Sequence, residues 1–372
     1  MKITFNRTAL LKAIIDAAAA SPTRTPKDIL RSVLLTGKAK LFEVIGTDQE
    51  IGIRARLPED AVIDNSSKEA VEVLLQPTRI RQILSEIADP QVTFEISDGS
   101  IRVISSNAKF KLTTEDAQGF PPVPSLVSED CWKVATPLFA QAIRRTEFAC
   151  DLESTRYALG GINVEIVADK VILAATDSRR LSVCEVPCEK VGNPQAISKT
   201  TVVPSKAWKA VSTACGHGAE FVEFVATEND ITFRVGNVSV YSRLVDGRFP
   251  RYRDVIPKQH DKHVTLPCSP FFAALRQAQI CLDKEARAVS IHFTNGTVRI
   301  DSNSQSGESA VEFPCEYEAD DLTLSVDPTY VADLLRTLPP EQLIEVSLKS
   351  PDDPMLVQVG DSLKYVVMPL AS

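Results

Sequence analysis

The feature that most constrains the fold of this sequence is a unit of strand, polar cap and helix that recurs about every 130 residues. Its first copy, residues 4–15, places apolar side chains at positions 10, 11, 14 and 15, the spacing of an amphipathic helix. Further copies occupy 134–145 and 266–276, where Thr136-Pro137 and Ser269-Pro270 predict an N-cap followed by proline at the first helical position.

A second unit, strand then proline then helix, lies between the copies of the first. Its three copies occupy residues 73–84, 202–211 and 324–335. Alternating strands follow each copy, as in 92–97 and 100–104 across the Asp98-Gly99 turn. The corresponding strands are 221–224 with 231–234, and 343–346 with 356–359.

These six units predict an α+β fold of three repeated domains, each with two helices and antiparallel sheet. A length of 372 residues is too great for one core and suits two or three domains. The Pro-rich segment 120–125 and the segment 256–260 place the domains at 1–127, 128–258 and 259–372. Three unrelated α+β domains are the alternative, and a shared order repeated six times argues against it.

Charge is distributed unevenly along the chain. The net charge is −8, yet the expected helices carry about 11 Lys or Arg against about 6 Asp or Glu. Ordinary helix solubility explains this equally well unless all six helices share one surface. The helical ranges are 6–20, 77–88, 136–149, 204–214, 269–284 and 327–338, and their basic residues include Arg7, Lys12, Arg79, Arg81, Arg144, Arg145, Lys206, Lys209 and Arg276.

A shared basic surface of this kind suits a ring around duplex DNA, because attraction to phosphate is independent of sequence. A helix is about 10–12 Å wide, so six abreast enclose a bore of only about 10 Å. Twelve helices enclose a bore of about 30 Å, which clears a duplex about 20 Å wide. We therefore expect a head-to-tail dimer with the helices lining the pore.

Several motifs stand in a fixed order along the chain, at 175–184, 242–253 and 365–370, with weaker ones at 46–48 and 156–161. Together they resemble the bacterial DNA polymerase III beta subunit, the DNA sliding clamp, and the resemblance covers essentially the whole chain. It implies a dimeric ring that encircles duplex DNA and tethers the replicative polymerase, the clamp loader and repair proteins through short linear peptides. It also implies no catalytic activity and no cofactor.

The resemblance further implies a pocket for partner peptides, in which Leu, Val, Met and Pro form an apolar cleft. From the residues alone, core packing of Met368 and a structural salt bridge of Arg180 remain open. The expected pocket residues are Leu159, Thr176, Asp177, Ser178, Arg179, Arg180, Leu181, Pro250, Asp254, Val255, Val366, Met368, Pro369 and Leu370.

The chain departs from the family pattern at three places in this pocket. Asp254 stands where some relatives have a basic residue, and the end Leu370-Ala371-Ser372 lacks an arginine found in others. Ser178-Arg179 replaces a commoner pair that begins with glycine. We therefore expect partner peptides with a different charge preference.

Two further sets of residues follow from the basic helices and the family match. For the ring interface, Lys109 and Phe110 match one edge of the family's subunit, and Ile280 and Cys281 match the opposing edge. The residues expected to meet DNA are Arg24, Arg79, Arg144, Arg145, Arg156, Tyr157 and Lys206.

An enzyme and a sequence-specific DNA binder are the rival interpretations. The sequence has no G-x-x-x-x-G-K-[ST], G-x-G-x-x-G, H-E-x-x-H or G-x-S-x-G motif, and only four histidines. A sequence-specific binder needs a recognition helix or ribbon rich in base-reading side chains, and the acidic balance disfavours it.

The eight cysteines are scattered without a C-x-x-C pair, which favours reduced thiols over disulfides and predicts no metal site. Arg7 and Lys12 interrupt any apolar core of a signal peptide, and no apolar run reaches about 18 residues. We therefore expect a cytoplasmic protein.

Overall fold

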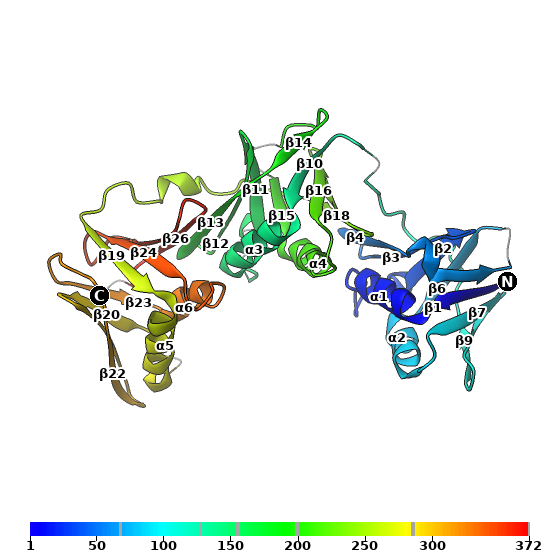
Figure 1. Cartoon of the computed structure of the whole chain (residues 1–372), viewed down its shortest axis with the longest axis horizontal. Coiled ribbons are helices and arrows are strands. Elements are labelled where there is room, and N and C mark those ends of the chain that lie inside the picture. The colour runs from blue at the N-terminus through cyan, green and yellow to red at the C-terminus, as the bar shows by residue number, and fades with distance from the viewer. Residues whose placement is uncertain (67–68, 127, 154–156, 198–200, 284–286, 371–372) are drawn as a thin grey trace. The chain divides into compact units, whose positions relative to one another are not determined.

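The computed structural model describes residues 1–66, 69–126, 128–153, 157–197, 201–283 and 287–370 (Figure 1). The contacts between residues divide the chain into two compact units. Unit 1 comprises Met1–Phe139, Cys188–Ile197 and Lys206–Leu244. Unit 2 comprises Ala140–Pro187, Ser198–Ser205 and Val245–Ser372. No helix of the described residues is long and apolar enough to cross a membrane.

All six expected helices are confirmed. The caps of α1 and α6 follow ordinary rules, since Asn6 accepts a hydrogen bond from the Ala9 amide and Asp327 accepts one from the Thr329 amide. The helices are α1 (Arg7–Ala18), α2 (Pro77–Glu86), α3 (Thr136–Thr146), α4 (Ser205–Cys215), α5 (Cys268–Ala278) and α6 (Pro328–Leu335).

The caps predicted at Thr136 and Ser269 are wrong. Helix α3 begins at Thr136 itself, and the buried Thr136 hydroxyl has no hydrogen-bond partner among the described residues. Helix α5 begins at Cys268, one residue before Ser269, and its N-cap is Pro267. In both cases the strand continues directly into the helix, so the polar residue falls inside the first turn.

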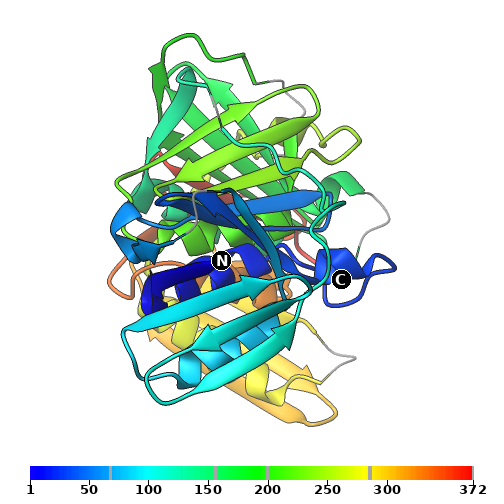
Figure 2. The ribbon, with the colours of Figure 1, turned by 90° about the vertical axis from the view of Figure 1, so that its right-hand side faces the viewer.

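Unit 1 holds a five-stranded sheet in the order β5-β1-β7-β8-β9 and a nine-stranded sheet in the order β14-β10-β16-β17-β18-β4-β3-β2-β6. Figure 2 shows the cyan strands β7 to β9 side by side. The strands are β1 (Lys2–Asn6), β2 (Val33–Lys38), β3 (Leu41–Thr47), β4 (Ile51–Arg56), β5 (Val62–Asn65), β6 (Val71–Leu75), β7 (Gln91–Ser97), β8 (Ser100–Ile104), β9 (Lys109–Thr113), β10 (Cys131–Ala135), β14 (Glu189–Val191), β16 (Phe221–Ala226), β17 (Asp230–Val235) and β18 (Val238–Arg243).

Unit 2 holds an eight-stranded sheet in the order β15-β11-β12-β13-β26-β25-β24-β19 and a four-stranded sheet in the order β22-β21-β20-β23. Its strands are β11 (Gly161–Val167), β12 (Lys170–Thr176), β13 (Arg180–Pro187), β15 (Thr201–Pro204), β19 (Lys262–Pro267), β20 (Val289–Thr294), β21 (Thr297–Ser304), β22 (Gly307–Pro314), β23 (Leu322–Val326), β24 (Leu343–Leu348), β25 (Met355–Val359) and β26 (Leu363–Val367).

Two strand pairs join neighbouring repeats into continuous sheets. Strand β18 pairs antiparallel with β4, from Val238 opposite Ala55 to Ser242 opposite Ile51. Strand β13 pairs antiparallel with β26, starting with Arg180 opposite Val367. Because these sheets cross between repeats, the two compact units do not coincide with the three repeats.

The cores follow from strand alternation and helical spacing. In unit 1, Ile3 and Phe5 point inward from β1 and meet Leu10 and Ile14 of α1 in one apolar cluster. Helices α1 and α2 pack against each other, and α1 covers β3 and β4 (Figure 1). A second cluster of unit 1 is aromatic and fully buried, and contains Phe139, Trp208, Phe224 and Phe233.

Candidate partner-docking site

A tight turn between β12 and β13 begins the site. The Thr176 hydroxyl donates to the Arg180 carbonyl at 2.6 Å, while Asp177 Oδ1 accepts the amides of Arg179 and Arg180, both at 2.9 Å. Ser178 has a φ of 74°, in the left-handed region that glycine adopts without strain. The serine that departs from the family pattern therefore occupies the one turn position where glycine is favoured.

Arg180, the first residue of β13, ties this turn to the rest of unit 2. Its Nε donates to Asp177 Oδ2 at 2.9 Å and its Nη1 to Asp333 Oδ2 of α6 at 2.7 Å. Its Nη2 donates to the Phe148 carbonyl at 2.7 Å, and the guanidinium lies over the Tyr330 ring at 4.8 Å. Arg180 therefore forms largely buried salt bridges with Asp177 and Asp333. This is the structural role that the sequence alone had left as an alternative.

Next to this turn lies an apolar cavity of about 290 Å³, here called the first hollow. The loop after Phe249 supplies one wall and the end of β26 supplies another. Val255 and Met368 are large apolar side chains that stay 53% and 39% exposed. The lining residues are Thr176, Ser178, Arg179, Arg180, Leu181, Pro250, Arg251, Tyr252, Val255, Val366 and Met368.

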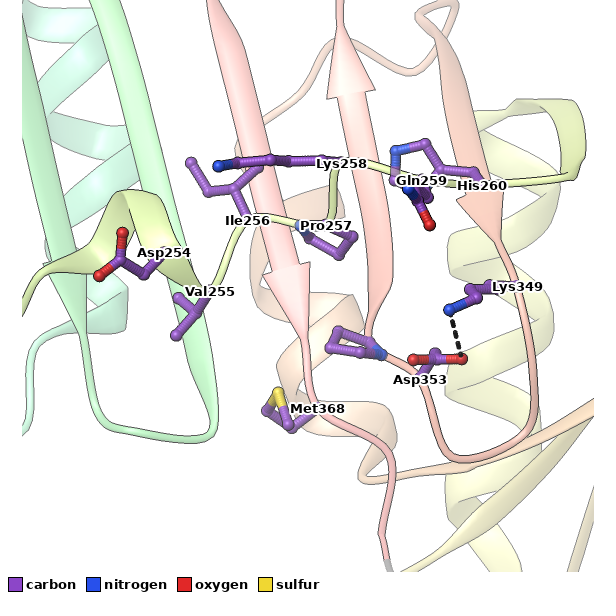
Figure 3. Close-up of a pocket in the computed structure, with 11 residues that line it drawn as sticks. Asp254, Val255, Ile256, Pro257, Lys258, Gln259, His260, Lys349, Asp353 and Met368 are labelled. Atoms are coloured by element: carbon purple, nitrogen blue, oxygen red, sulfur yellow. Dashed lines mark ion pairs between the residues drawn. The ribbon is translucent and has the colours of Figure 1, made fainter.

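A second cavity of about 510 Å³, the second hollow, adjoins the first and shares Val255 and Met368 with it. Figure 3 shows the segment 254–260 along one side of this hollow and the ion pair of Lys349 with Asp353 at the other. The remaining lining residues are Asp254, Ile256, Pro257, Lys258, Gln259, His260 and Pro354.

The structure thus brings most of the expected pocket residues together, with several exceptions. Leu159 is buried and Asp177 is used in the turn, and neither lines a hollow. Asp254 lines the second hollow instead of the first. Pro369 and Leu370 follow β26, where the Leu370 amide donates to the Ser325 carbonyl at 2.8 Å.

Sequence reasoning missed Arg251 and Tyr252 in the first hollow and nearly all of the second. Arg251 and Tyr252 stand beside the predicted Pro250, so their place in the 242–253 motif could have found them. The segment 256–260 has no periodic pattern, and nothing in the sequence indicates that it lines a cavity.

The residues expected to meet DNA differ in their placement. Arg24, Arg79, Arg144 and Lys206 are exposed, and Lys206 is ion-paired with Asp48. The expectation for Arg145 is wrong, because its side chain is only 5% exposed and burial lowers the pKa of its guanidinium. Arg156 and the side chain of Tyr157 lie outside the described residues.

The residues expected at the ring interface lie at two outer strands. Lys109 and Phe110 belong to β9, the last strand of its sheet; Lys109 is exposed and Phe110 packs partly against the core of unit 1. Ile280, 79% exposed, and Cys281 belong to the short helix η6 (Gln279–Cys281). The Cys281 thiol lies 3.4 Å from the Glu308 carbonyl of β22, the last strand of the other sheet.

Cys184 and Cys215 are buried and line neither hollow. Burial raises the pKa of the Cys184 thiol to about 11 and that of Cys215 to about 11, so both stay protonated at neutral pH and are poor nucleophiles. Within the described ranges, no three His, Cys, Asp or Glu side chains are grouped to hold a metal ion. The first hollow offers an apolar surface edged by arginines, and the second is lined by both lysines and aspartates.

Three domain models of the DNA polymerase III beta subunit match the chain in order: the N-terminal domain at residues 1–124, the central domain at 133–251 and the C-terminal domain at 253–371. The chain belongs to the DNA polymerase III beta subunit family. It has the three-domain sliding clamp fold, and its function is that of a processivity clamp with no catalytic activity of its own.

Relatives and solved structures agree over the full length. The chain is 26% identical to the beta sliding clamp of Bacillus subtilis, covering 100% of this chain and 99% of that one. It is 28% identical to that of Escherichia coli, covering 100% of both. The structure of Caulobacter crescentus pol III beta aligns with a TM-score of 0.87 at 26% identity over 100% of both chains. A Pseudomonas aeruginosa sliding clamp aligns with a TM-score of 0.90 at 24% identity, again over 100% of both chains.

We predict that Arg180→Gln destabilises unit 2 by about 3 kcal/mol, because Asp177 then stays largely buried without a cation and Asp333 keeps only its ion pair with the exposed Arg336. Urea denaturation of the full chain measures this effect. Arg179→Gln is the matched control, since Arg179 is exposed and makes no ion pair among the described residues. Equal midpoints for both variants contradict a structural role for the Arg180 bridge.

Proposed function

We propose that two copies of this chain close head to tail into a ring around duplex DNA, and that its domains are 1–127, 128–258 and 259–372. Strand topology is the observation that supports this most strongly. Strands β4, β13 and β22 each come third after the first helix of their repeat, and β9, β18 and β26 each come third after the second helix.

Within the described chain, the third strand after a second helix pairs with the third strand after the first helix of the preceding repeat. Strand β18 of the middle repeat pairs with β4 of the first, and β26 of the last repeat pairs with β13 of the middle. The pattern leaves β9 of the first repeat and β22 of the last repeat at open sheet edges. We infer that β9 of one protomer pairs antiparallel with β22 of the next.

The two open edges also carry opposite charge. Lys109 and Lys111 are exposed on β9, while Glu308 and Glu312 are exposed on β22. Exposed Ile280 beside β22 offers apolar area for the same junction. An isologous dimer would pair each edge with an identical edge of like charge. A head-to-tail dimer pairs β9 with β22 and so brings opposite charges together.

Exposed basic residues on the helices support the DNA part of the proposal. Lys12 of α1, Arg79 and Arg81 of α2, Lys209 of α4 and Arg276 of α5 are exposed, so their charge is available to phosphate. In the proposed ring of twelve helices these side chains face the duplex. The exposed Arg24 and Arg144 join them, and Lys206 joins them by exchanging its ion pair with Asp48 for one with phosphate.

The peptide-docking part of the proposal rests on the first hollow. Its apolar wall, with Met368 free to change rotamer, suits short linear peptides of differing sequence. We infer that the replicative polymerase, the clamp loader and repair proteins dock there.

The ring predicts a solution mass of twice 40.7 kDa. Lys109→Glu with Lys111→Glu should give monomers, because like charges then oppose each other across the junction. Adding Glu308→Lys and Glu312→Lys to the same chain should restore the dimer.

Light scattering across a dilution series measures this prediction. Lys38→Glu with Lys40→Glu makes the same charge change on β2 and the turn after it, away from both open edges, and should stay dimeric. A wild-type monomer at all concentrations, or a swap that restores nothing, contradicts the pairing of β9 with β22.

A closed ring also predicts topological retention on DNA. Protein loaded by a clamp loader onto closed circular DNA should stay bound at 0.5 M salt and leave once the circle is linearised. Simple phosphate attraction decays steeply with salt on both forms. Gel filtration of labelled protein with DNA distinguishes the two, and equal loss from both forms rules the ring out.

For the first hollow, Met368→Ala should weaken binding of a polymerase-derived peptide roughly tenfold, because a central apolar anchor is lost. Fluorescence polarisation measures the affinity, and light scattering should show an unchanged mass. Leu343→Ala, an exposed leucine that lines neither hollow, is the control. Unchanged affinity for Met368→Ala would overturn the assignment of the pocket.

A further inference from the structure

We propose that the second hollow receives acidic residues that flank the docking peptide, and that Lys258 binds them. This inference rests on the proposed function of the first hollow and adds the chemistry of the peptide's flank. It assigns a separate role to a segment that joins the middle and last repeats.

Continuity between the two hollows is the first argument. Val255 and Met368 line both cavities, and both residues are exposed. Figure 3 shows Val255 and Met368 at the end of the second hollow opposite Lys349 and Asp353. A peptide that leaves the first hollow across these two side chains enters the second.

The charges of the second hollow are the next argument. Asp254 is ion-paired with Arg251 at 3.4 Å. Asp353 is ion-paired with Lys349 at 3.9 Å and accepts the Ser350 hydroxyl at 2.7 Å. Both carboxylates of the hollow are therefore engaged by groups of the chain itself.

Lys258 is different, because it is exposed and makes no ion pair with any residue that the structure describes. It is the cation of the second hollow whose charge is uncompensated. His260 adds no charge at neutral pH, since burial and then the neighbouring His263 lower its pKa. The hollow therefore presents one free ammonium group, which attracts a carboxylate.

The backbone of the segment also suits an extended partner. Among the described residues, no backbone hydrogen bond uses the amides of Ile256, Lys258, Gln259 or His260. Extended peptides bind through main-chain hydrogen bonds together with pockets for their side chains. The segment can therefore hold the flank of a peptide while Lys258 selects its charge.

Five fluorescent peptides test the proposal with the full-length protein. The first is a short apolar core peptide. The other four carry three added Glu or three added Gln residues at either the N-terminal or the C-terminal end. Polarisation gives each Kd at low salt and at 0.5 M salt.

Glu at one end should tighten binding to the wild type by about fivefold at low salt, and Gln should not. The gain should shrink at high salt, because exposed ion pairs are screened. Lys258→Gln should remove the gain, measured as the ratio of Glu-extended to core affinity. Lys40→Gln, which removes an exposed lysine outside both hollows, should keep it.

The outcomes separate this inference from the proposed function. Failure of the core peptide to bind overturns docking in the first hollow. Normal core binding with no Glu gain, or a gain that survives Lys258→Gln, overturns the role of the second hollow alone. If the Lys258→Gln variant binds a duplex oligonucleotide more weakly than the wild type does, and the Glu gain stays intact, the lysine binds phosphate. That result also overturns the role of the second hollow.

Discussion

Backbone pairing between the third strands of neighbouring repeats is the interaction on which the remaining architecture depends. The ladders of β18 with β4 and of β13 with β26 satisfy main-chain donors and acceptors that otherwise face solvent at sheet edges. Each ladder joins two repeats into one sheet, so the repeats cannot pack as separate bodies. The same rule applied once more leaves one open edge at each end of the series, and in the proposed ring a second copy pairs with it.

The candidate docking site lies where one of these ladders begins. The turn before β13 repeats the turn before β4 in detail: Thr47 and Asp48 make the same hydrogen bonds as Thr176 and Asp177, and Gln49, like Ser178, has a positive φ. The residue that follows differs, because Ile51 is simply buried whereas Arg180 reaches Asp333 and the Phe148 carbonyl. This one difference on a shared turn ties the second junction to α6 beside the first hollow.

The sequence predicts much of this arrangement, and the predictions that fail do so for physical reasons. Helices and hairpins follow from periodicity, which reports the buried face directly. Periodicity fails at Arg144 and Arg145, because adjacent helical residues point about 100° apart and only the fold decides which one faces solvent. It also fails at 256–260, where an irregular segment lines a cavity through its tertiary neighbours. The Thr-Asp turns were visible as 46–48 and 175–184, but their shared geometry was not.

In the proposed ring, charge decides which open edges meet. Two β9 edges would place Lys109 and Lys111 against their own copies, and two β22 edges would do the same with Glu308 and Glu312. Like charges directly opposite on paired strands are destabilising, so pairing of β9 with β9 or of β22 with β22 is disfavoured. Only β9 against β22 brings opposite charges together, and that pairing is head to tail. The internal junctions need no such selection, because the chain itself holds β18 near β4 and β26 near β13, and these strands carry mostly uncharged residues. A charged outer junction is also the one that salt or a partner can loosen without disturbing the apolar sheets inside each chain.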